Sequence, residues 1–172
     1  HKHGIYATFM AKPMQREAGS AMHIHQSLVD SSSGANIFVD AEGKHSAALG
    51  HYIAGLQKYT PELISFYAPN VNSYRRLAPE ISAPINLNWG VDNRTVAFRV
   101  PHSGPEGTRV ENRFPGADVN PYLAFAATLA SGYLGMKQAL QPTAPHKGTA
   151  NENQIEVARS LEEGLRLLQD SD

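Results

Sequence analysis

The chain has 172 residues, of which 41% are hydrophobic and 18% are charged, and this composition is typical of one globular domain with a sizeable core and excludes a disordered chain. Its formal net charge of -1 argues against non-specific nucleic-acid binding, and the lack of cysteine excludes disulfides and thiolate metal ligands. No apolar run is long enough to cross a membrane and no signal-peptide pattern opens the chain, so we expect a cytoplasmic protein with neither a nucleic-acid nor a membrane partner.

The first half of the chain is predicted to contain strands followed by helices. Its strand-forming stretches, which are rich in β-prone side chains or alternate apolar with polar residues, are 4–10, 21–29 and 36–40. Apolar side chains then recur at helical spacing from Ser46 to Tyr59. We expect this helix to end at Thr60, which caps a second short helix beginning at Pro61. A long loop rich in Pro, Asn and Ser follows over residues 68–84, and its length favours a functional role.

The second half predicts a hairpin, a further strand and two helices. Residues 85–89 and 95–100 flank a polar turn and are expected to pair as a β-hairpin, with 109–114 as the next strand. Residues 120–140 begin with an Asn-Pro pair suited to a helix N-terminus and are apolar nearly all round, so they should form the central buried helix. Residues 155–168 form a last amphipathic helix. Strands paired antiparallel, with the helices on one side, give an α+β fold.

Arginine is concentrated in one part of the chain. Six of the nine arginines lie between Arg75 and Arg113, a stretch without lysine, and guanidinium groups pair bidentately with phosphates and carboxylates. In a strand over 109–114, alternation places Arg109, Glu111 and Arg113 on one face, two cations around one acid. The pKa of Glu111 is therefore expected to be low, as a ligand of a divalent metal requires. The pattern favours anion binding beside a metal; a surface strand with a ladder of salt bridges is the alternative.

Two histidines and a glycine turn lie near the other predicted strand. His23 and His25 are two residues apart and share a face with Ser27, and both metal ligation and nucleotide contact are open to them. Gly19, just before this strand, offers a turn at which a ligand could approach the backbone. The chain has neither a P-loop nor a dinucleotide-binding glycine motif, so arginines and a metal would have to hold any nucleotide.

Several motifs, in order along the chain, resemble those of the catalytic domain of glutamine synthetases. They are residues 12–13, 19–27, 72–77, 83–84, 92–94, 99–101, 109–115 and 117–123. The resemblance covers residues 4–140 and implies that family's fold, an antiparallel curved sheet with helices packed on one side. It also implies that residues 1–172 are part of one catalytic domain, with the N-terminal domain and the upstream catalytic strands outside this chain.

The resemblance further implies a reaction and a set of site residues. The family makes γ-glutamyl phosphate from glutamate and ATP, and an amine then displaces the phosphate. By motif position, the implied roles are metal ligation (Mg²⁺ or Mn²⁺) for His23 and Glu111, nucleotide binding for His25, Ser27 and Arg109, glutamate binding for Gly19, Arg76 and Arg113, and stabilisation of the transferring phosphoryl group for Arg94. Arg75 and Arg99 are expected to be structural. The family assembles into homo-oligomeric rings in which a neighbour's N-terminal domain completes each site, so we expect this chain alone to be inactive.

Three departures from the family pattern concern the amine. Ser82 stands where ammonia-using members present a glutamate, residues 104–107 replace a segment with a usual lysine, and a tyrosine loop is absent from 145–154. With Trp89 and the run 92–97, these features resemble the γ-glutamylpolyamine synthetase branch, which joins glutamate to an amine larger than ammonia. An ordinary glutamine synthetase and a non-catalytic homologue are the alternatives.

Overall fold

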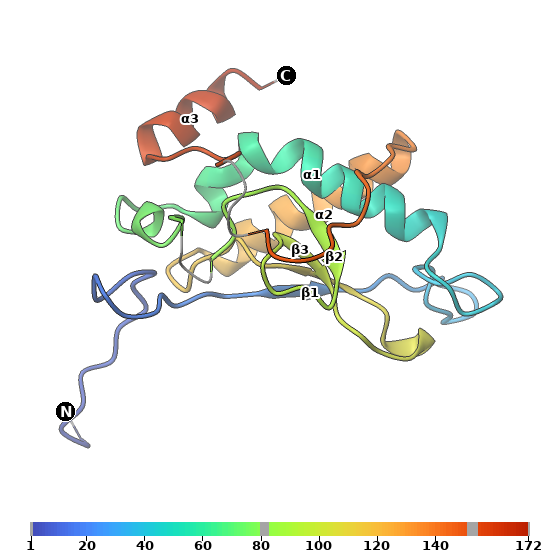
Figure 1. Cartoon of the computed structure of the whole chain (residues 1–172), viewed down its shortest axis with the longest axis horizontal. Coiled ribbons are helices and arrows are strands. Elements are labelled where there is room, and N and C mark those ends of the chain that lie inside the picture. The colour runs from blue at the N-terminus through green and yellow to red at the C-terminus, as the bar shows by residue number, and fades with distance from the viewer. Residues whose placement is uncertain (1, 80–82, 151–154, 172) are drawn as a thin grey trace.

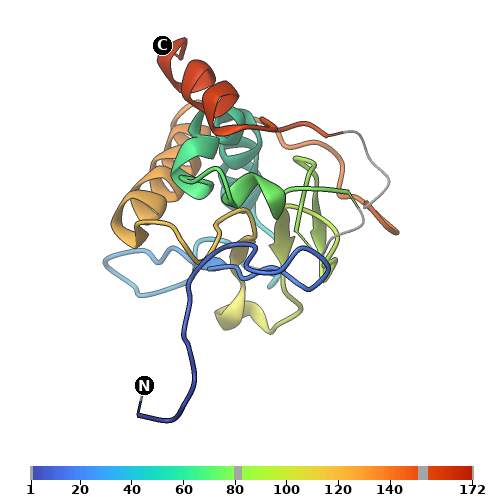
Figure 2. The same ribbon diagram turned by 90° about the vertical axis from the view of Figure 1, so that its left-hand side faces the viewer.

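The computed structural model describes residues 2–79, 83–150 and 155–171 and shows an α+β arrangement, as expected (Figure 1). In chain order its elements are β1 (Ile24–Gln26), α1 (Ala47–Tyr67), the 3₁₀ turn η1 (Ser73–Arg75), β2 (Trp89–Val91), β3 (Phe98–Val100), the 3₁₀ turn η2 (Pro105–Gly107), β4 (Val110–Asn112), α2 (Pro121–Lys137) and α3 (Leu161–Gln169). The helices group on one side of the strands, as Figure 2 shows. None of the helices in the described residues is long and apolar enough to cross a membrane.

The four strands form a mixed sheet in the order β1-β4-β3-β2. The central strand β4 pairs antiparallel with β1 and with β3, as expected. β2 and β3 pair in parallel, however, so the predicted hairpin is wrong. The polar connection 92–97 carries the chain back to the start of β2 instead of turning tightly. Asn93 fixes this path, because its side-chain oxygen accepts hydrogen bonds from the Thr95 amide and hydroxyl while its amide group donates to Gly148.

Two of the predicted strands are absent from the described structure. Residues 5–10 extend away from the body of the protein (Figures 1 and 2), and Ile5, Tyr6 and Phe9 are largely exposed. A β-prone sequence forms a strand only where a neighbouring strand takes up its backbone hydrogen bonds, and the described structure places none beside this arm. Residues 36–40 make only the isolated bridges of Asn36 with Val29 and of Val39 with His45.

Helix α1 is continuous where two helices were predicted. Ser46 is its N-cap, accepting a hydrogen bond from the Leu49 amide, whereas Thr60, the predicted cap of a second helix, lies inside α1. Pro61 lies inside the helix and does not begin a second one. A proline removes one backbone hydrogen bond, but Leu56 before it and Ile64 after it are fully buried. Packing of both segments against the same core holds them in line.

Helix α2 is not buried all round, which corrects the expectation of a central buried helix. Asn120 caps it as expected, accepting from the amides of Tyr122 and Leu123. Most of its large apolar side chains face solvent, and these are Tyr122, Leu123, Phe125, Leu129 and Tyr133. Its buried face consists of small residues, which are Ala124, Ala127, Thr128, Ser131, Gly132 and Gly135. Small side chains let α1 approach closely, whereas hydropathy alone suggested that the larger residues would turn inward.

Helix α3 is shorter than predicted. It begins at Leu161, after the N-cap Ser160, whose hydroxyl accepts a hydrogen bond from the Glu163 amide. The described residues from Ile155 to Ser160 are irregular. Glu156 is used there instead in a contact with the body of the protein, because its amide donates to the Ile85 carbonyl and its carboxylate accepts from the Leu87 amide.

A substitution at Gly55 tests the close packing of α1 against α2. An added Cβ would lie 2.1 Å from the Ser131 carbonyl oxygen and 2.8 Å from the backbone of Gly135. Overpacking of this kind costs about 1 to 3 kcal/mol, more than the gain of about 1 kcal/mol from helix propensity. We expect Gly55→Ala to lower the free energy of unfolding in urea by about 2 kcal/mol. Gly50→Ala is the control in the same helix, because its nearest neighbour, Pro142, would be 3.6 Å away. Equal stabilities of the two variants would contradict this packing.

Candidate active site

Glu111 on the central strand is the centre of the candidate site. Its side chain is only 5% exposed, and Oε1 lies 2.7 Å from Nδ1 of His23. Oε2 accepts a hydrogen bond of 2.9 Å from Nη1 of Arg99. Strand register explains this convergence, because His25 on β1 and Arg99 on β3 are both direct partners of Glu111. Three strands therefore bring an acid, two imidazoles and a guanidinium to one face of the sheet.

The two faces of β4 separate as the sequence predicts. Val110, Asn112 and Phe114 are buried toward the helices, where the Asn112 amide donates to the Thr128 hydroxyl of α2. Glu111 and the neighbouring arginines occupy the other face. One face thus joins the core, and the other carries the charged groups.

Glu111 is held in its ionised form. Burial alone would raise its pKa, but hydrogen bonds from His23 and Arg99, together with the charge of nearby Arg113, lower it from 4.5 to about 2. The expectation of a depressed pKa at Glu111 is confirmed. A buried carboxylate that stays ionised is a suitable ligand for a hard divalent cation.

His23, His25 and Ser27 are all exposed and share one face of the β1 segment, as predicted, while Ile24 between the histidines is buried. Arg109 donates from Nε to Nδ1 of His25 at 3.2 Å. Burial lowers the pKa of His25, the charge of Glu111 opposes this, and the charge of Arg109 adds to it. The neutral ring, with Nδ1 as acceptor, carries its proton on Nε2. Among the described residues, Ser27 makes no hydrogen bond with His23, His25 or Arg109.

A cavity of about 150 Å³ beside Glu111 brings together residues that the resemblance assigns to the substrate. Gly19, His23, Arg76 and Arg113 line it, with three alanines, Ala18, Ala21 and Ala83, on the remaining wall. Arg76 is buried, and its guanidinium donates to the carbonyl oxygens of Arg113 and Phe114. Burial and the charge of Arg113 lower the pKa of Arg76 to about 10, so it remains charged at neutral pH. Two arginines that line one small cavity favour an anionic ligand.

Gly19 occupies its position for a steric reason. A Cβ there would lie 2.7 Å from the carbonyl oxygen of Ala11 and 3.1 Å from Cγ of Arg76. The same carbonyl accepts a hydrogen bond from the Ser20 amide, so it cannot easily move away. The turn before β1 is thus packed directly on the Arg76 side chain, and the close approach of a ligand to the Gly19 backbone stays a prediction.

Arg94 lies in the connection between β2 and β3, with an exposed side chain. Its carbonyl oxygen accepts a hydrogen bond from Arg113. Burial lowers the pKa of Arg113, the charge of Glu111 opposes this, and the charges of Arg99 and Arg94 lower the pKa further. The structure therefore places Arg94 next to the cavity of Arg76 and Arg113.

Arg99 is a site residue that the sequence reasoning missed. A structural role was expected for it, and its five-residue spacing from Arg94 would place the two side chains on opposite faces of an unbroken strand. β3 begins only at Phe98, so that alternation does not apply, and Arg99 bonds Glu111 directly. Strand register was the signal that could have found it, but the register was not readable from one sequence.

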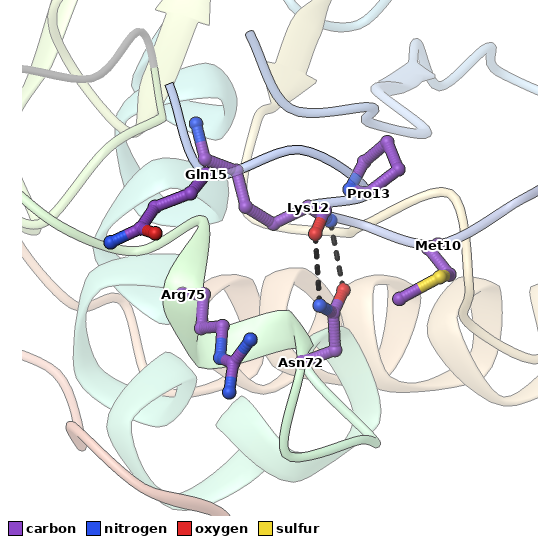
Figure 3. Close-up of a pocket in the computed structure, with 6 residues that line it drawn as sticks. All are labelled: Met10, Lys12, Pro13, Gln15, Asn72 and Arg75. Carbon is purple, nitrogen blue, oxygen red and sulfur yellow. Dashed lines mark hydrogen bonds between the residues drawn. The ribbon is translucent and has the colours of Figure 1, made fainter. Parts of the chain in front are cut away.

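Asn72 is a second residue that was missed, and it bonds the backbone of the loop that precedes the site. Its amide group donates to the Lys12 carbonyl and accepts from the Lys12 amide, both at 2.9 Å, as Figure 3 shows. The two residues line a separate cavity of about 540 Å³ together with Met10, Pro13, Gln15 and Arg75. Arg75 faces this second cavity and not that of Arg76. The Asn72 bonds fix the loop before β1 to η1 and thereby hold Gly19 against Arg76.

The donor set of His23 and Glu111 fits a divalent cation in part. Nitrogen and oxygen ligands lie about 2.0 to 2.6 Å from such ions, so two atoms 2.7 Å apart can bind the same ion. Across the described ranges, no group of three or more His, Asp or Glu side chains could hold a metal. The described part of the chain thus offers two ligands of a site that needs more.

Comparison with known proteins agrees with the geometry. Residues 1–172 match the family model described as glutamine synthetase, catalytic domain. This chain belongs to the glutamine synthetase family. A glutamate–isopropylamine ligase of Pseudomonas sp is 43% identical over 177 residues, which cover 99% of this chain and 38% of that protein. The glutamine synthetase of Pyrococcus woesei is 45% identical over 142 residues, covering 83% of the chain and 32% of the relative. The γ-glutamylputrescine synthetase of Escherichia coli (strain K12) is 46% identical over 139 residues, which cover 81% of this chain and 29% of that protein.

The family expected from the motifs is therefore confirmed. The chain spans about a third of the length of these relatives. The names of these relatives include a glutamine synthetase, a glutamate–isopropylamine ligase and a γ-glutamylputrescine synthetase, so membership of the glutamine synthetase family leaves the amine open.

The pKa of Glu111 predicts how stability depends on pH. A folded pKa of about 2 against 4.5 in the unfolded chain stabilises the fold above pH 4.5 by about 3 kcal/mol, and this stability is lost as the pH falls toward 2. In urea unfolding between pH 5.5 and 3, we expect the stability advantage of the wild type over Glu111→Gln to shrink steadily. An advantage that stays constant across this range would contradict an ionised Glu111 in the folded state.

Proposed function

We propose that the protein is an ATP-dependent ligase that activates glutamate as γ-glutamyl phosphate and joins it to an amine. The observation that carries this proposal is the cavity that Arg76 and Arg113 line together with His23, which is paired with Glu111. Phosphoryl transfer to a carboxylate needs a site that binds the substrate carboxylate and a bound cation beside it. The anion-binding pocket supplies the first, and the ionised carboxylate and the imidazole supply part of the ligands for the second.

The glutamate substrate is assigned to this cavity. Arg76 and Arg113 pair with its carboxylate groups, and the backbone of Gly19 forms the wall that a side chain would otherwise fill. Because both guanidinium groups are largely buried, their pairing with a carboxylate is less screened than on the surface. The small volume of about 150 Å³ suits a single amino acid rather than a peptide.

The cation is assigned to His23 and Glu111, and the phosphates are assigned to the arginines and histidines around them. His23 and Glu111 hold Mg²⁺ or Mn²⁺, which when bound neutralises charge on the transferring phosphoryl group. Arg109 and His25, joined at 3.2 Å, contact the nucleotide together with Ser27. Arg94 extends from an exposed connection next to Arg113 and stabilises the phosphoryl group during transfer, as arginine does in other phosphoryl-transfer enzymes.

For the amine, a primary amine or polyamine larger than ammonia is the first choice. The glutamate–isopropylamine ligase aligns with 99% of this chain and the Pyrococcus woesei glutamine synthetase with 83%, so the match to the amine ligase extends further. Ser82, one of the sequence features behind this inference, lies outside the described residues. The use of ammonia by an ordinary glutamine synthetase is the second candidate.

The remaining proposals concern the whole protein. We assign it to the cytoplasm and to a homo-oligomeric ring, in which parts beyond this chain supply further metal ligands and the amine pocket. The two ligands offered by the described residues agree with a site completed from elsewhere. Residues 1–172 alone are accordingly proposed to be inactive.

Gly19→Ala tests the glutamate pocket in the full-length protein. The added methyl group would push against the Ala11 carbonyl and Arg76, so we expect the KM for glutamate to rise roughly 10-fold, a loss of about 1.4 kcal/mol in binding, with a smaller change in kcat. Gly104→Ala is the matched control, because nothing lies within 4 Å of its added Cβ. An unchanged KM in Gly19→Ala would place glutamate elsewhere.

A panel of amines tests the reaction itself. The full-length protein is assayed for phosphate release with ATP, glutamate and either ammonia, isopropylamine, ethanolamine, putrescine or spermidine. We expect kcat/KM for at least one primary amine to exceed that for ammonia by about 10-fold or more, a barrier difference of about 1.4 kcal/mol. Preference for ammonia would favour an ordinary glutamine synthetase, and no release with any amine would favour a non-catalytic homologue.

A further inference from the structure

Arg99 bridges two carboxylates at the edge of the candidate site. Nη1 donates to Oε2 of Glu111 at 2.9 Å, and Nη2 pairs with Oδ1 of Asp92. The two acids differ in setting, since the Glu111 side chain is 5% exposed and that of Asp92 is 55% exposed. One end of the guanidinium fork thus reaches into the site, and the other is anchored at its surface.

The backbone around this bridge is fixed. Arg99 lies in the middle of β3, opposite both Gly90 of β2 and Glu111 of β4. Asp92 takes a left-handed conformation, with φ of 49°, and its amide donates to the Val100 carbonyl. Asp92 is therefore held beside β3, where its carboxylate pairs with Nη2 of Arg99.

The contact with Arg99 determines how Glu111 presents its oxygens. With Oε2 bonded to Arg99, the other oxygen, Oε1, faces Nδ1 of His23 at 2.7 Å and lies 3.8 Å from Nε of Arg113. A free glutamate side chain would rotate among several orientations. Two ligands can share one ion only when their donor atoms converge, and such fixed orientation commonly comes from hydrogen bonds outside the ligand set.

We propose that Arg99, anchored by Asp92, is a positioning residue that acts through Glu111 to keep Oε1 turned toward His23 for binding of a divalent cation. This inference rests on the proposed function, because it assumes that His23 and Glu111 are metal ligands. It replaces the purely structural role expected for Arg99.

Charge and orientation predict opposite effects of removing Arg99. If Arg99 acted only as a nearby positive charge, its loss would strengthen cation binding, since like charges repel. If it orients Glu111, its loss weakens binding although a repulsive charge has gone. Loss of such supporting hydrogen bonds typically costs about 10- to 100-fold in metal affinity. The sign of the change separates the two roles.

The test is Mn²⁺ binding to the full-length protein, measured by electron paramagnetic resonance of the free ion. We expect Arg99→Met to weaken Mn²⁺ binding about 10-fold or more. Arg99→Lys keeps the charge but cannot bridge both acids, and it is expected to weaken binding to a smaller extent. Arg75→Met removes an equal charge from an exposed arginine outside the site and should leave the affinity unchanged.

Two Asp92 variants probe the anchor without altering a residue of the proposed ligand set. Asp92→Ala removes the acceptor and should weaken Mn²⁺ binding several-fold, whereas Asp92→Asn keeps an acceptor oxygen and should have a smaller effect. Thermal unfolding without metal checks that each variant is folded. If Arg99→Met does not fold, the Asp92→Ala result decides.

The outcomes separate this inference from the proposed function. A wild-type protein that binds no Mn²⁺ overturns both the metal site and the inference. Mn²⁺ binding by the wild type, with equal or tighter binding by folded Arg99→Met, overturns the positioning role alone. If Arg99→Met is unfolded, unchanged binding by Asp92→Ala does the same. Weaker binding in the deciding variant, with Arg75→Met unchanged, supports the inference.

Discussion

The buried carboxylate of Glu111 is the constraint on which the site depends. An ionised group inside a protein is strongly destabilising unless charges and hydrogen bonds surround it. Here His23 and Arg99 contact its two oxygens, and Arg113 lies 3.8 Å from one of them. These partners lie just before β1, in β3 and just after β4, so the charge is stable only when all three strands are in register. The strand order, with β4 between β1 and β3, thus supplies the partners that the buried Glu111 carboxylate needs.

The helices provide the rigid support behind this charged face. Asn112, next to Glu111 on β4, donates to the Thr128 hydroxyl of α2, so the central strand is tied to the helix layer. Gly55 and Gly135 allow α1 and α2 to approach until their backbones are in contact. Residues that bear the charges and residues that fill the core therefore alternate along the same strand, and movement of one set would disturb the other. The positions of the site residues are consequences of core packing.

The predictions made from the sequence held where a local signal decided the structure and were wrong where a distant partner decided it. The cap Asn120, the start of α1 next to Ser46 and the alternation around Glu111 were predicted correctly, because each depends on a few neighbouring residues. Pro61 was expected to begin a new helix, but packing on both sides kept α1 continuous. The large residues of α2 were expected inside, but close contact between the helices required the small ones there.

The sequence by itself determined the family, the α+β class and the group of charged residues, because ordered motifs and residue chemistry are written along the chain. Only the tertiary structure decided that Arg99 bonds Glu111, that β2 and β3 run parallel, and that Asn72 holds the loop of Gly19. Each of these depends on strand register or on contacts between residues far apart in the chain. Such contacts form when the whole core packs, and no local pattern specifies them.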